Sequence, residues 1–488
     1  MSPRSSVYEA DRARERLSPR ARHAGDPRQA TEAGIGKGAS INLDTDITGG
    51  AVDPTGRIIY DGLNLTLGQG TGIATYTRML TRIARKLGYD VGVVYSSAFT
   101  PDKNPLLGEI LFFDQMRAPH QLGTKRTPTR ILNTVVDQFR YHFTVKPLAL
   151  RLGDAVINEQ FADTLAEHDR AFVARNLFKN VNSFFNRTSQ FVNLSFDSRP
   201  DIFHCTYPMP VRVRSARNIY TIHDLIPLRL PFATLESKRR TFKLLKDVAK
   251  KADHIVTVSE NSKQDIVELL GVDERRITNT YQAVALPRKY SERSEAAVGN
   301  YIDGLYGLEM YGYLLFFGAL EPKKNVGRLI DAFLASGVDV PLVLVTARGW
   351  HNADVVHRLD ELSSKGGGAA KVRCLDYVGL STLITLIRGA RAVVFPSLYE
   401  GFGLPVLEAM MLGTPVVTSA NGALGEIAGD AALLVDPYDV DDIARGITTI
   451  VNDADLRGEL NRRGTAQAAK FSVERYQERV QSLYASLT

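Results

Sequence analysis

The chain has 488 residues, of which 44% are hydrophobic, and this is enough for two or three globular domains. Its 60 lysines and arginines outnumber its 54 aspartates and glutamates, a mild excess that suits an anionic small molecule or an acidic membrane and does not require nucleic acid. The apolar runs are shorter than the roughly 20 residues of a membrane span, and no signal-peptide core is present. Only two cysteines occur, without metal-ligand spacing, so we expect a cytoplasmic protein.

The beginning of the chain predicts a tail followed by a βαβ unit. Residues 1–55 are rich in arginine, serine, glycine and aspartate, a composition that is typical of a disordered basic tail. "RIIYDGLN" then predicts a strand, "GTGIATYTRMLTRIARKLG" a helix and "DVGVVYS" a second strand. Residues from about 100 to 198 mix polar and aromatic side chains, and we interpret them as an insertion with a helix near 159–185.

Short strands alternate with helices in two parts of the chain, and this alternation predicts parallel sheets covered on both faces. Residues 56–287 form the first predicted domain, the polar stretch 288–311 a linker, and residues 312–470 the second domain. Ligands bind beyond the carboxyl ends of such strands, so we expect a cleft where the two sets of strand ends face each other. The last helix, 471–488, has apolar residues near helical spacing and is expected to pack back on the first domain.

The stretch "YEGFGLPVLEAM" places two carboxylates beyond a predicted strand. Glu400 lies in a loop, and Glu408 is expected in the first turn of a helix that begins near a proline. The glycines let the backbone approach a ligand, and the N–H groups of Phe402, Gly403 and Leu404 are available for oxygen or anionic groups. Alternatively, Glu408 could serve only to complement the helix dipole.

Glu400 and Glu408, within "PSLYEGFGLPVLEAMMLGTPVV", resemble the E-x7-E signature of retaining glycosyltransferases of family 4. The likeness covers about 57–95 and 200–488 and includes the stretches "GTGIATYT", "TIHDLIP", "HIVTVSENSKQDI", "GALEPKKNVGRLIDAF" and "GEIAGDAALLVDP". It implies the GT-B fold, an α/β architecture in which two Rossmann-like, doubly wound parallel-sheet domains face a central cleft. The first domain would bind the acceptor and the second a nucleotide sugar, with no metal ion or other cofactor.

The resemblance also implies roles for individual residues. Lys324, with Lys323 beside it, would bind the diphosphate of the donor. Glu400 would hold hydroxyls of the transferred sugar, and Glu408 would accept hydrogen bonds from both ribose hydroxyls. His223, which follows a predicted strand, would reach the donor sugar, although a histidine at a strand end is often structural.

One diphosphate contact departs from the family pattern. Many family members place an arginine soon after the strand glycine, but here Gly318 is followed by Ala319. The second contact would then come from Lys323, or from the N–H groups of the loop that contains Gly70 and Gly72.

The forms "EPKKN" and "HDLIP" resemble those of bacterial polysaccharide and O-antigen enzymes. The expected reaction is retaining transfer of a hexose from GDP-mannose, or as a second choice from a UDP-hexose, to a hydroxyl of a saccharide or lipid-linked saccharide. One alternative is a protein that binds sugar nucleotides without turnover. Another is an NAD-dependent oxidoreductase, suggested by "GQGTG", but the ribose-binding acid is missing from the end of the second strand. Two D-x-D triplets follow no suitable strand, so no metal is predicted.

Residues 236–251 predict a basic amphipathic helix with seven lysines or arginines. Its apolar residues, at helical spacing, are Phe242, Leu245, Val248 and Ala249. Such a helix could make a peripheral contact with an anionic membrane on its cytoplasmic side. Alternatively, the apolar stripe packs on the sheet and the basic residues are solvated.

Overall fold

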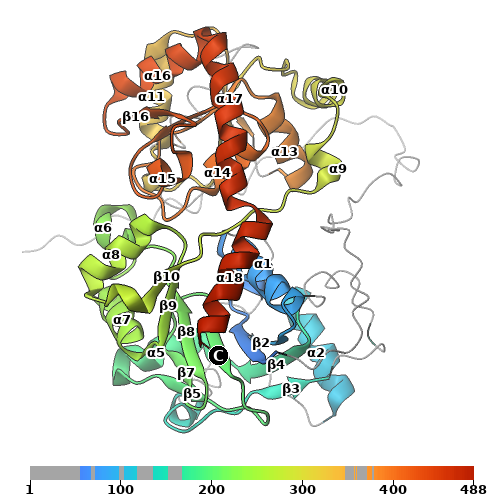
Figure 1. Cartoon of the computed structure of the whole chain (residues 1–488), viewed down its shortest axis with the longest axis vertical. Coiled ribbons are helices and arrows are strands. Elements are labelled where there is room, and N and C mark those ends of the chain that lie inside the picture. Colours follow the sequence, from blue (N-terminus) through green and yellow to red (C-terminus); the bar gives the residue numbers. More distant parts are fainter. Residues whose placement is uncertain are drawn as a thin grey trace, which may run out of the picture. The chain divides into compact units, whose positions relative to one another are not determined.

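A computed structural model describes residues 55–66, 72–97, 104–117, 136–151, 156, 167–346, 355, 357, 359, 371–375 and 378–487. Nearly all of the expected tail lies outside these ranges, and so does Gly70. The described residues belong to one compact unit, Ile41–Thr488, which contains two large sheets (Figure 1). We call residues 55–279 the first lobe and residues 314–468 the second lobe.

The first lobe contains an eight-stranded sheet in the order β10-β9-β8-β6-β1-β2-β4-β3, in which only the β3–β4 pair is antiparallel among the described strands. The strands are β1 Arg57–Asp61, β2 Asp90–Ser97, β3 Leu148–Leu150, β4 Arg170–Arg175, β6 Ile202–Cys205, β8 Arg217–Thr221, β9 His254–Thr257 and β10 Ile277–Asn279, with β5 Val192–Leu194 and β7 Val211–Val213 pairing separately. The helices of this lobe are α1 Gly72–Lys86, α2 Pro105–Arg117, α5 Leu177–Thr188, α6 Ile226–Arg229, α7 Lys238–Lys251 and α8 Glu260–Leu270.

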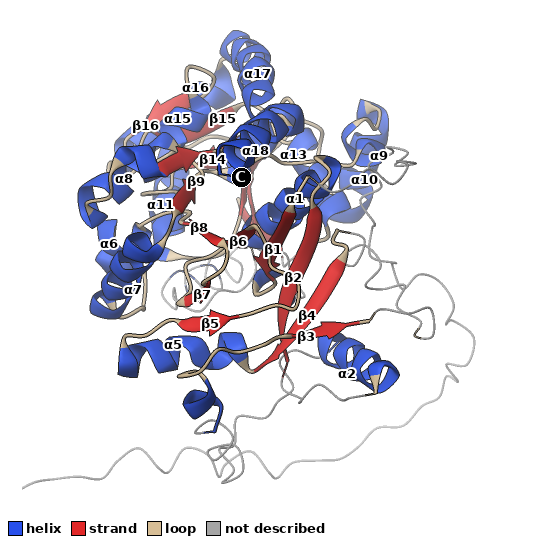
Figure 2. Cartoon of the chain, turned by 60° about the horizontal axis from the view of Figure 1, so that its bottom comes forward, coloured by secondary structure: helices blue, strands red, loops and turns tan. Residues whose placement is uncertain are grey.

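The segment interpreted as an insertion contributes to the main sheet. Residues 170–175 form β4, which pairs with β2, so the helix expected near 159–185 is wrong over this stretch. The strand "RAFVAR" buries Ala171 and Val173, but the amphipathic helix α5 begins only two residues after it and its helical period obscures the shorter pattern. Figure 2 shows β3 and α2 at the edge of the sheet beside β4.

The second lobe contains a six-stranded parallel sheet in the order β13-β12-β11-β14-β15-β16. Its strands are β11 Leu314–Phe317, β12 Leu342–Val345, β13 Val372–Leu375, β14 Ala392–Phe395, β15 Val416–Ser419 and β16 Leu433–Val435. Its helices are α11 Val326–Ser336, α13 Leu380–Gly389, α14 Leu404–Met411, α15 Leu424–Ala428, α16 Val440–Asn452 and α17 Ala454–Ala468. The central strands are buried along their whole length, which explains their unbroken apolar sequences "LLFF", "LVLV" and "AVVF".

The stretch expected to be a linker, 288–311, is largely helical. It contains α9 Arg288–Ser291 and α10 Glu295–Tyr306. Val298 and Ile302 of α10 are fully buried, and a side chain at Gly389 of α13 would meet both of them. The apolar spacing of four residues is the helical signal, but polar residues and the glycines around it make the pattern weak.

The last helix, α18 Val473–Leu487, packs against the first lobe through tyrosines. The hydroxyl of Tyr484 lies 2.7 Å from that of Tyr60 on β1 and 2.9 Å from Nδ1 of His204 on β6. The preceding helix, α17, packs on α14 of the second lobe. In the part of the chain that the structure describes, no helix has the length and apolar character needed to cross a membrane.

Candidate functional site

Two neighbouring strands of the second lobe place the basic pair and the first glutamate side by side. The short 3-10 turn η5 Pro322–Lys324 follows β11, and the segment containing Glu400 follows β14, which pairs with β11. The N–H of Leu398 donates to the carbonyl oxygen of Lys323 at 2.7 Å and ties the two loops together. Because carboxyl ends of adjacent parallel strands meet at one edge, side chains 76 residues apart in sequence become neighbours here.

Glu400 lies between the two lysines and is 6% exposed. Nζ of Lys324 is 2.6 Å from Oε1 of Glu400, and Nζ of Lys323 is 3.6 Å from Oε2. Nζ of Lys323 also lies 3.5 Å from Glu321, and Nζ of Lys324 lies 4.8 Å from the ring centroid of Phe395. A buried carboxylate between two ammonium groups fixes all three side chains before any ligand arrives.

Burial and ion pairing compete in this cluster. Burial alone would raise the pKa of Glu400, but the nearby charges of Lys323 and Lys324 outweigh it and the pKa is lowered. Burial lowers the pKa of Lys324 in spite of its pair with Glu400. Burial acts in the same direction on Lys323, but Glu400, Asp224 and Glu321 together raise its pKa. The cluster therefore holds an ionised carboxylate whose lysine partners have further N–H donors for a ligand.

The backbone at the start of α14 offers hydrogen-bond donors. Gly403 has a φ of 108° and precedes the helix, and Pro405 lies in the first turn as expected. Among the described residues, none accepts a hydrogen bond from the N–H groups of Phe402, Gly403 or Leu404. Three adjacent free amides at a helix N-terminus can bind phosphate or hydroxyl oxygens.

Glu408 lies one turn later than the sequence indicates. It is the fifth residue of α14, whose first turn holds no acid, so the expected placement in the first turn is wrong. A proline in the first turn can be preceded by another helical residue, and here Leu404 begins the helix. Burial raises the pKa of Glu408 to about 7, and no described residue pairs with its carboxylate. The stabilising effect of the helix dipole on an acid falls off within the first turn, so it does not explain Glu408 at this position.

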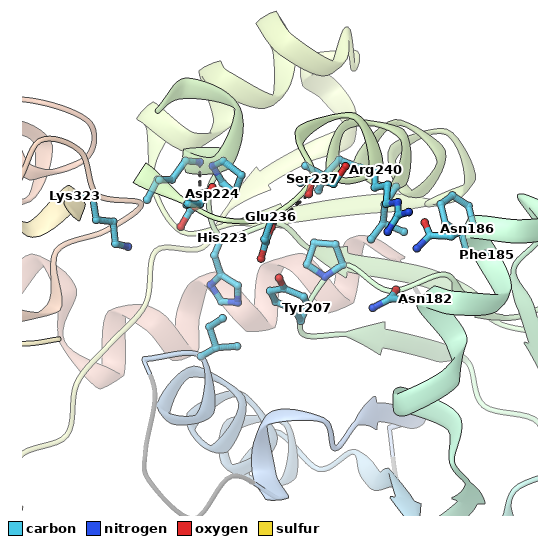
Figure 3. Close-up of a pocket in the computed structure, with 18 of the residues that line it drawn as sticks. Asn182, Phe185, Asn186, Tyr207, His223, Asp224, Glu236, Ser237, Arg240 and Lys323 are labelled. Carbon is cyan, nitrogen blue, oxygen red and sulfur yellow. Dashed lines mark hydrogen bonds between the residues drawn. The ribbon is translucent and has the colours of Figure 1, made fainter. Parts of the chain in front are cut away.

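His223 follows β8 and faces a cavity of about 610 Å³. Its Nε2 is 2.9 Å from the carbonyl oxygen of Thr206, and its ring meets the edge of Tyr76 at 4.8 Å between centroids. Burial lowers the pKa of His223, so the ring is neutral at pH 7. Figure 3 shows Lys323 at one end of this cavity, Asn186 at the other, and His223 and Tyr207 between them.

The start of α1 lies in the same region. Gly72 is the first residue of α1, and a Cβ placed on it would lie 3.1 Å from Cδ1 of Leu404. The start of α1 in the first lobe therefore lies against the start of α14 in the second lobe. Of the two glycines proposed as diphosphate contacts, only Gly72 can be placed, since Gly70 lies outside the described residues.

Sequence reasoning missed the contacts that hold the Glu400 loop against α8. The carbonyl oxygen of Gly401 accepts from Oγ of Ser259 at 2.8 Å and lies 3.3 Å from Oγ of Ser262. A Cβ on Gly401 would lie 2.7 Å from Cβ of Asp224, so only glycine fits there. The helix-capping pattern in "VSENSKQDI" was the available signal, because Ser259 caps α8.

A second set of contacts joins the start of α8 to the second lobe, through Tyr399 beside Glu400 and through Glu426 of α15. The hydroxyl of Tyr399 donates to Asn261 at 2.5 Å or Asp265 at 2.6 Å. The carboxylate of Glu426 accepts from the N–H groups of Glu260 and Asn261 at 3.0 and 3.3 Å. The loop that carries Glu400 is thus fixed from both lobes.

Replacing Gly403 by alanine is expected to destabilise the protein by about 1 to 3 kcal/mol, because its φ of 108° is unfavourable for other residues and the new Cβ would lie 2.7 Å from Leu424. Gly458→Ala is the matched control, since it lies inside α17 with no atom within 4 Å of an added Cβ. Urea unfolding should show a lower free energy of unfolding for Gly403→Ala and no decrease for Gly458→Ala. Equal stability of both would contradict the strained backbone at Gly403.

Comparison with known proteins supports one family. Family models described as Glycosyltransferase Family 4 and Glycosyl transferases group 1 match residues 148–286 and 307–467. O-antigen chain mannosyltransferase B from Escherichia coli is 37% identical over 266 residues, which are 54% of this chain and 68% of the relative. The chain belongs to the family-4 glycosyltransferases.

Other relatives of this glycosyltransferase match over smaller shares of their length. Serotype-specific mannosyltransferase WbdA from Escherichia coli is 30% identical over 262 residues, which cover 52% of this chain and 32% of that protein.

Among solved structures, Anabaena HepE in complex with UDP and glucose aligns with a TM-score of 0.59 at 15% identity, covering 88% of this chain and all of that one. Sucrose-phosphate synthase from Thermosynechococcus elongatus aligns with a TM-score of 0.58 at 16% identity, covering 88% and 99%. The predicted GT-B fold is confirmed.

Proposed function

We propose that this glycosyltransferase transfers a mannosyl group from GDP-mannose to a hydroxyl of a saccharide or lipid-linked saccharide, with retention at the anomeric carbon. The observation that carries the proposal is the buried cluster of Lys323, Lys324 and Glu400 beside three free backbone amides. The mannosyltransferase names of the relatives support mannose as the transferred sugar. A UDP-hexose is the second candidate donor.

The cluster suits a reaction in which negative charge grows on a leaving diphosphate. The bond between C1 of the sugar and the phosphate oxygen breaks, and the acceptor oxygen bonds to C1 on the same face. The proton of the acceptor hydroxyl passes to the departing phosphate. Lys324 and Lys323 stabilise the growing charge, while Glu400 and the amides of Phe402 and Gly403 hold hydroxyls of the sugar.

Glu408 and His223 complete the donor site in this proposal. Glu408 accepts hydrogen bonds from the two ribose hydroxyls through its carboxylate, which has no partner among the described residues. His223 is neutral and lines the same cavity as Lys323. The acceptor occupies the remainder of that cavity, which extends toward Asn186 and Arg240.

Release of free nucleoside diphosphate tests the proposal. The protein is incubated with GDP-mannose, other GDP-sugars and UDP-hexoses, each with and without a mannose-containing saccharide acceptor. We expect GDP release from GDP-mannose that increases with acceptor. Binding of sugar nucleotides without any release would instead identify a sugar-nucleotide-binding protein without turnover.

Contact with an anionic membrane is a separate part of the proposal, since a lipid-linked acceptor would lie at the cytoplasmic face. The apolar stripe of α7 mostly packs inward, because Leu245, Val248 and Ala249 are buried, whereas Phe242 is 41% exposed. The side chains of Phe232 and Leu235, which shortly precede α7 in the sequence, are also exposed. Membrane contact would therefore use these three side chains together with the basic face of the helix.

The protein is expected to sediment with anionic vesicles and not with neutral ones, because each basic residue near the surface adds about 1 kcal/mol. Salt at about 0.5 M should abolish the binding by screening. Binding should weaken when Lys238, Arg239, Arg240 and Lys243 are changed to glutamine. The control changes four arginines elsewhere to glutamine: Arg445, Arg462, Arg463 and Arg475. If vesicle binding is lost only in the control variant, the membrane contact does not lie on α7.

A further inference from the structure

Asp61 is a buried carboxylate that the proposed mechanism does not use. It is the last residue of β1 and is 1% exposed. Its Oδ2 accepts hydrogen bonds from the N–H and, at 2.8 Å, from the hydroxyl of Thr206. Its Oδ1 accepts from the N–H of Leu63 at 3.2 Å. No lysine or arginine pairs with it among the described residues, so it does not form part of an ion pair.

Thr206 connects this carboxylate to His223. Asp61 holds two atoms of Thr206, and the carbonyl oxygen of the same residue lies 2.9 Å from Nε2 of His223. A carbonyl oxygen can only accept, so Nε2 must carry the hydrogen. The ring is neutral because burial lowers its pKa, and Nδ1 is therefore left with a lone pair.

The Nδ1 atom of His223 has no partner among the described residues, and the side chain lines the cavity that also contains Lys323 and Asp224. A lone pair there can accept a hydrogen bond from a substrate hydroxyl. The opposite tautomer would present an N–H and would lose the bond to Thr206. The position of the Thr206 carbonyl thus decides whether the histidine accepts or donates toward the cavity.

We propose that Asp61 is a positioning residue that, through Thr206, fixes His223 in the tautomer with hydrogen on Nε2, so that Nδ1 accepts a hydrogen bond from a hydroxyl of the sugar substrate. The substrate part of this inference rests on the proposed function. Burial raises the pKa of Asp61 to about 6, so the carboxyl group is mostly ionised at pH 7 and both oxygens accept. Asparagine at this position has one acceptor oxygen, so it cannot satisfy Thr206 and Leu63 together.

The tautomer can be measured without any substrate. Protein labelled with ¹⁵N-histidine contains nine histidines, and the signal of His223 is assigned from its loss in His223→Gln. At pH 7 we expect wild-type His223 to show hydrogen on Nε2. Asp61→Asn should disturb this single tautomer. Tyr220→Phe, which removes a buried hydroxyl from β8, the strand that precedes His223, should leave it unchanged.

Steady-state kinetics give the functional readout. Asp61→Asn should lower kcat on the order of 10²-fold, as expected for misplacement of a reacting group, and leave affinity for the nucleoside diphosphate unchanged. Thr206→Ser, which keeps the hydroxyl, should retain wild-type behaviour, whereas Thr206→Val should resemble Asp61→Asn. If Asp61→Asn does not fold, the comparison of Thr206→Ser with Thr206→Val tests the same inference.

Two results would overturn the inference: hydrogen on Nδ1 in the wild type, or an unchanged His223 signal in both Asp61→Asn and Thr206→Val. A changed tautomer with unchanged kcat would also refute the role in catalysis. If the wild type turns over no sugar nucleotide, the proposed function fails, and the tautomer measurement still decides whether Asp61 controls His223.

Discussion

Lys324→Ala is expected to lower kcat about 10²- to 10³-fold, or about 2.7 to 4 kcal/mol, because in the proposed mechanism it removes one preorganised donor to the leaving diphosphate. The lysine is nearly buried, and its Nζ lies 2.6 Å from Glu400, so the loss cannot be replaced by a mobile surface cation. The measurement is the rate of nucleoside diphosphate release at saturating donor. Turnover at the wild-type rate would refute the assignment.

Lys146→Ala is the matched control, because Lys146 is exposed and pairs with the exposed Asp197. It should keep wild-type turnover. Lys324→Ala leaves Glu400 with Lys323 at 3.6 Å as its nearest cation, so some loss of stability is expected. The double change Lys324→Ala with Glu400→Gln removes the stranded charge, and it should restore stability without restoring turnover.

Glu408→Gln is expected to weaken binding of the nucleoside diphosphate by about 2 to 4 kcal/mol, or roughly 30- to 10³-fold in Kd. The change keeps the shape of the side chain but weakens the two charge-assisted hydrogen bonds that we propose it makes to the ribose. Calorimetric titration of the variant and of Glu478→Gln, an exposed glutamate on α18, measures the effect. Unchanged affinity in Glu408→Gln would exclude the ribose contact.

The raised pKa of Glu408 adds a pH dependence. Burial raises it from 4.5 to about 7, so the free protein holds the carboxyl group largely protonated at pH 6. Nucleotide affinity should therefore rise between about pH 6 and pH 8 in the wild type, and this Glu408-dependent rise should be absent in Glu408→Gln.

The same raised pKa affects the stability of the free protein. As pH rises, the carboxyl group loses its proton at a lower pH in the unfolded state than in the folded state. Glu408 therefore lowers the free energy of unfolding as pH rises from about 4.5 to 7. At pH 8 the variant should melt no lower than the wild type.

Much of the fold could be predicted because buried parallel strands carry a strong signal. The four-residue runs of β11, β12 and β14 are entirely apolar, and each is followed by a helical period. The strand β4 could not be separated from α5, because its six residues carry too short a pattern beside a long amphipathic helix. Helix α10 falls within the stretch predicted to be a linker, because only Val298 and Ile302 mark its buried face and two apolar residues give a weak helical pattern.

The candidate site was predicted in its residue types, and its geometry was not. Lys324, Glu400 and Glu408 stand in short motifs whose chemistry can be read directly from the chain. Nothing in the sequence shows that Glu400 pairs with the lysines, because that contact depends on the adjacency of β11 and β14. The link from Asp61 through Thr206 also joins residues 145 positions apart, so only the folded chain brings them together.

We propose that the cluster of Lys323, Lys324 and Glu400 supports retaining sugar transfer, and nuclear magnetic resonance of one reaction can test this. In that reaction, GDP-α-mannose labelled with ¹³C at C1 is mixed with a saccharide acceptor and the protein. We expect GDP to appear together with a new α-mannoside, identified by its one-bond coupling at C1, and we expect Lys324→Ala to slow both signals equally. A β-linked product would contradict the retaining mechanism, and full wild-type turnover by Lys324→Ala would contradict the site.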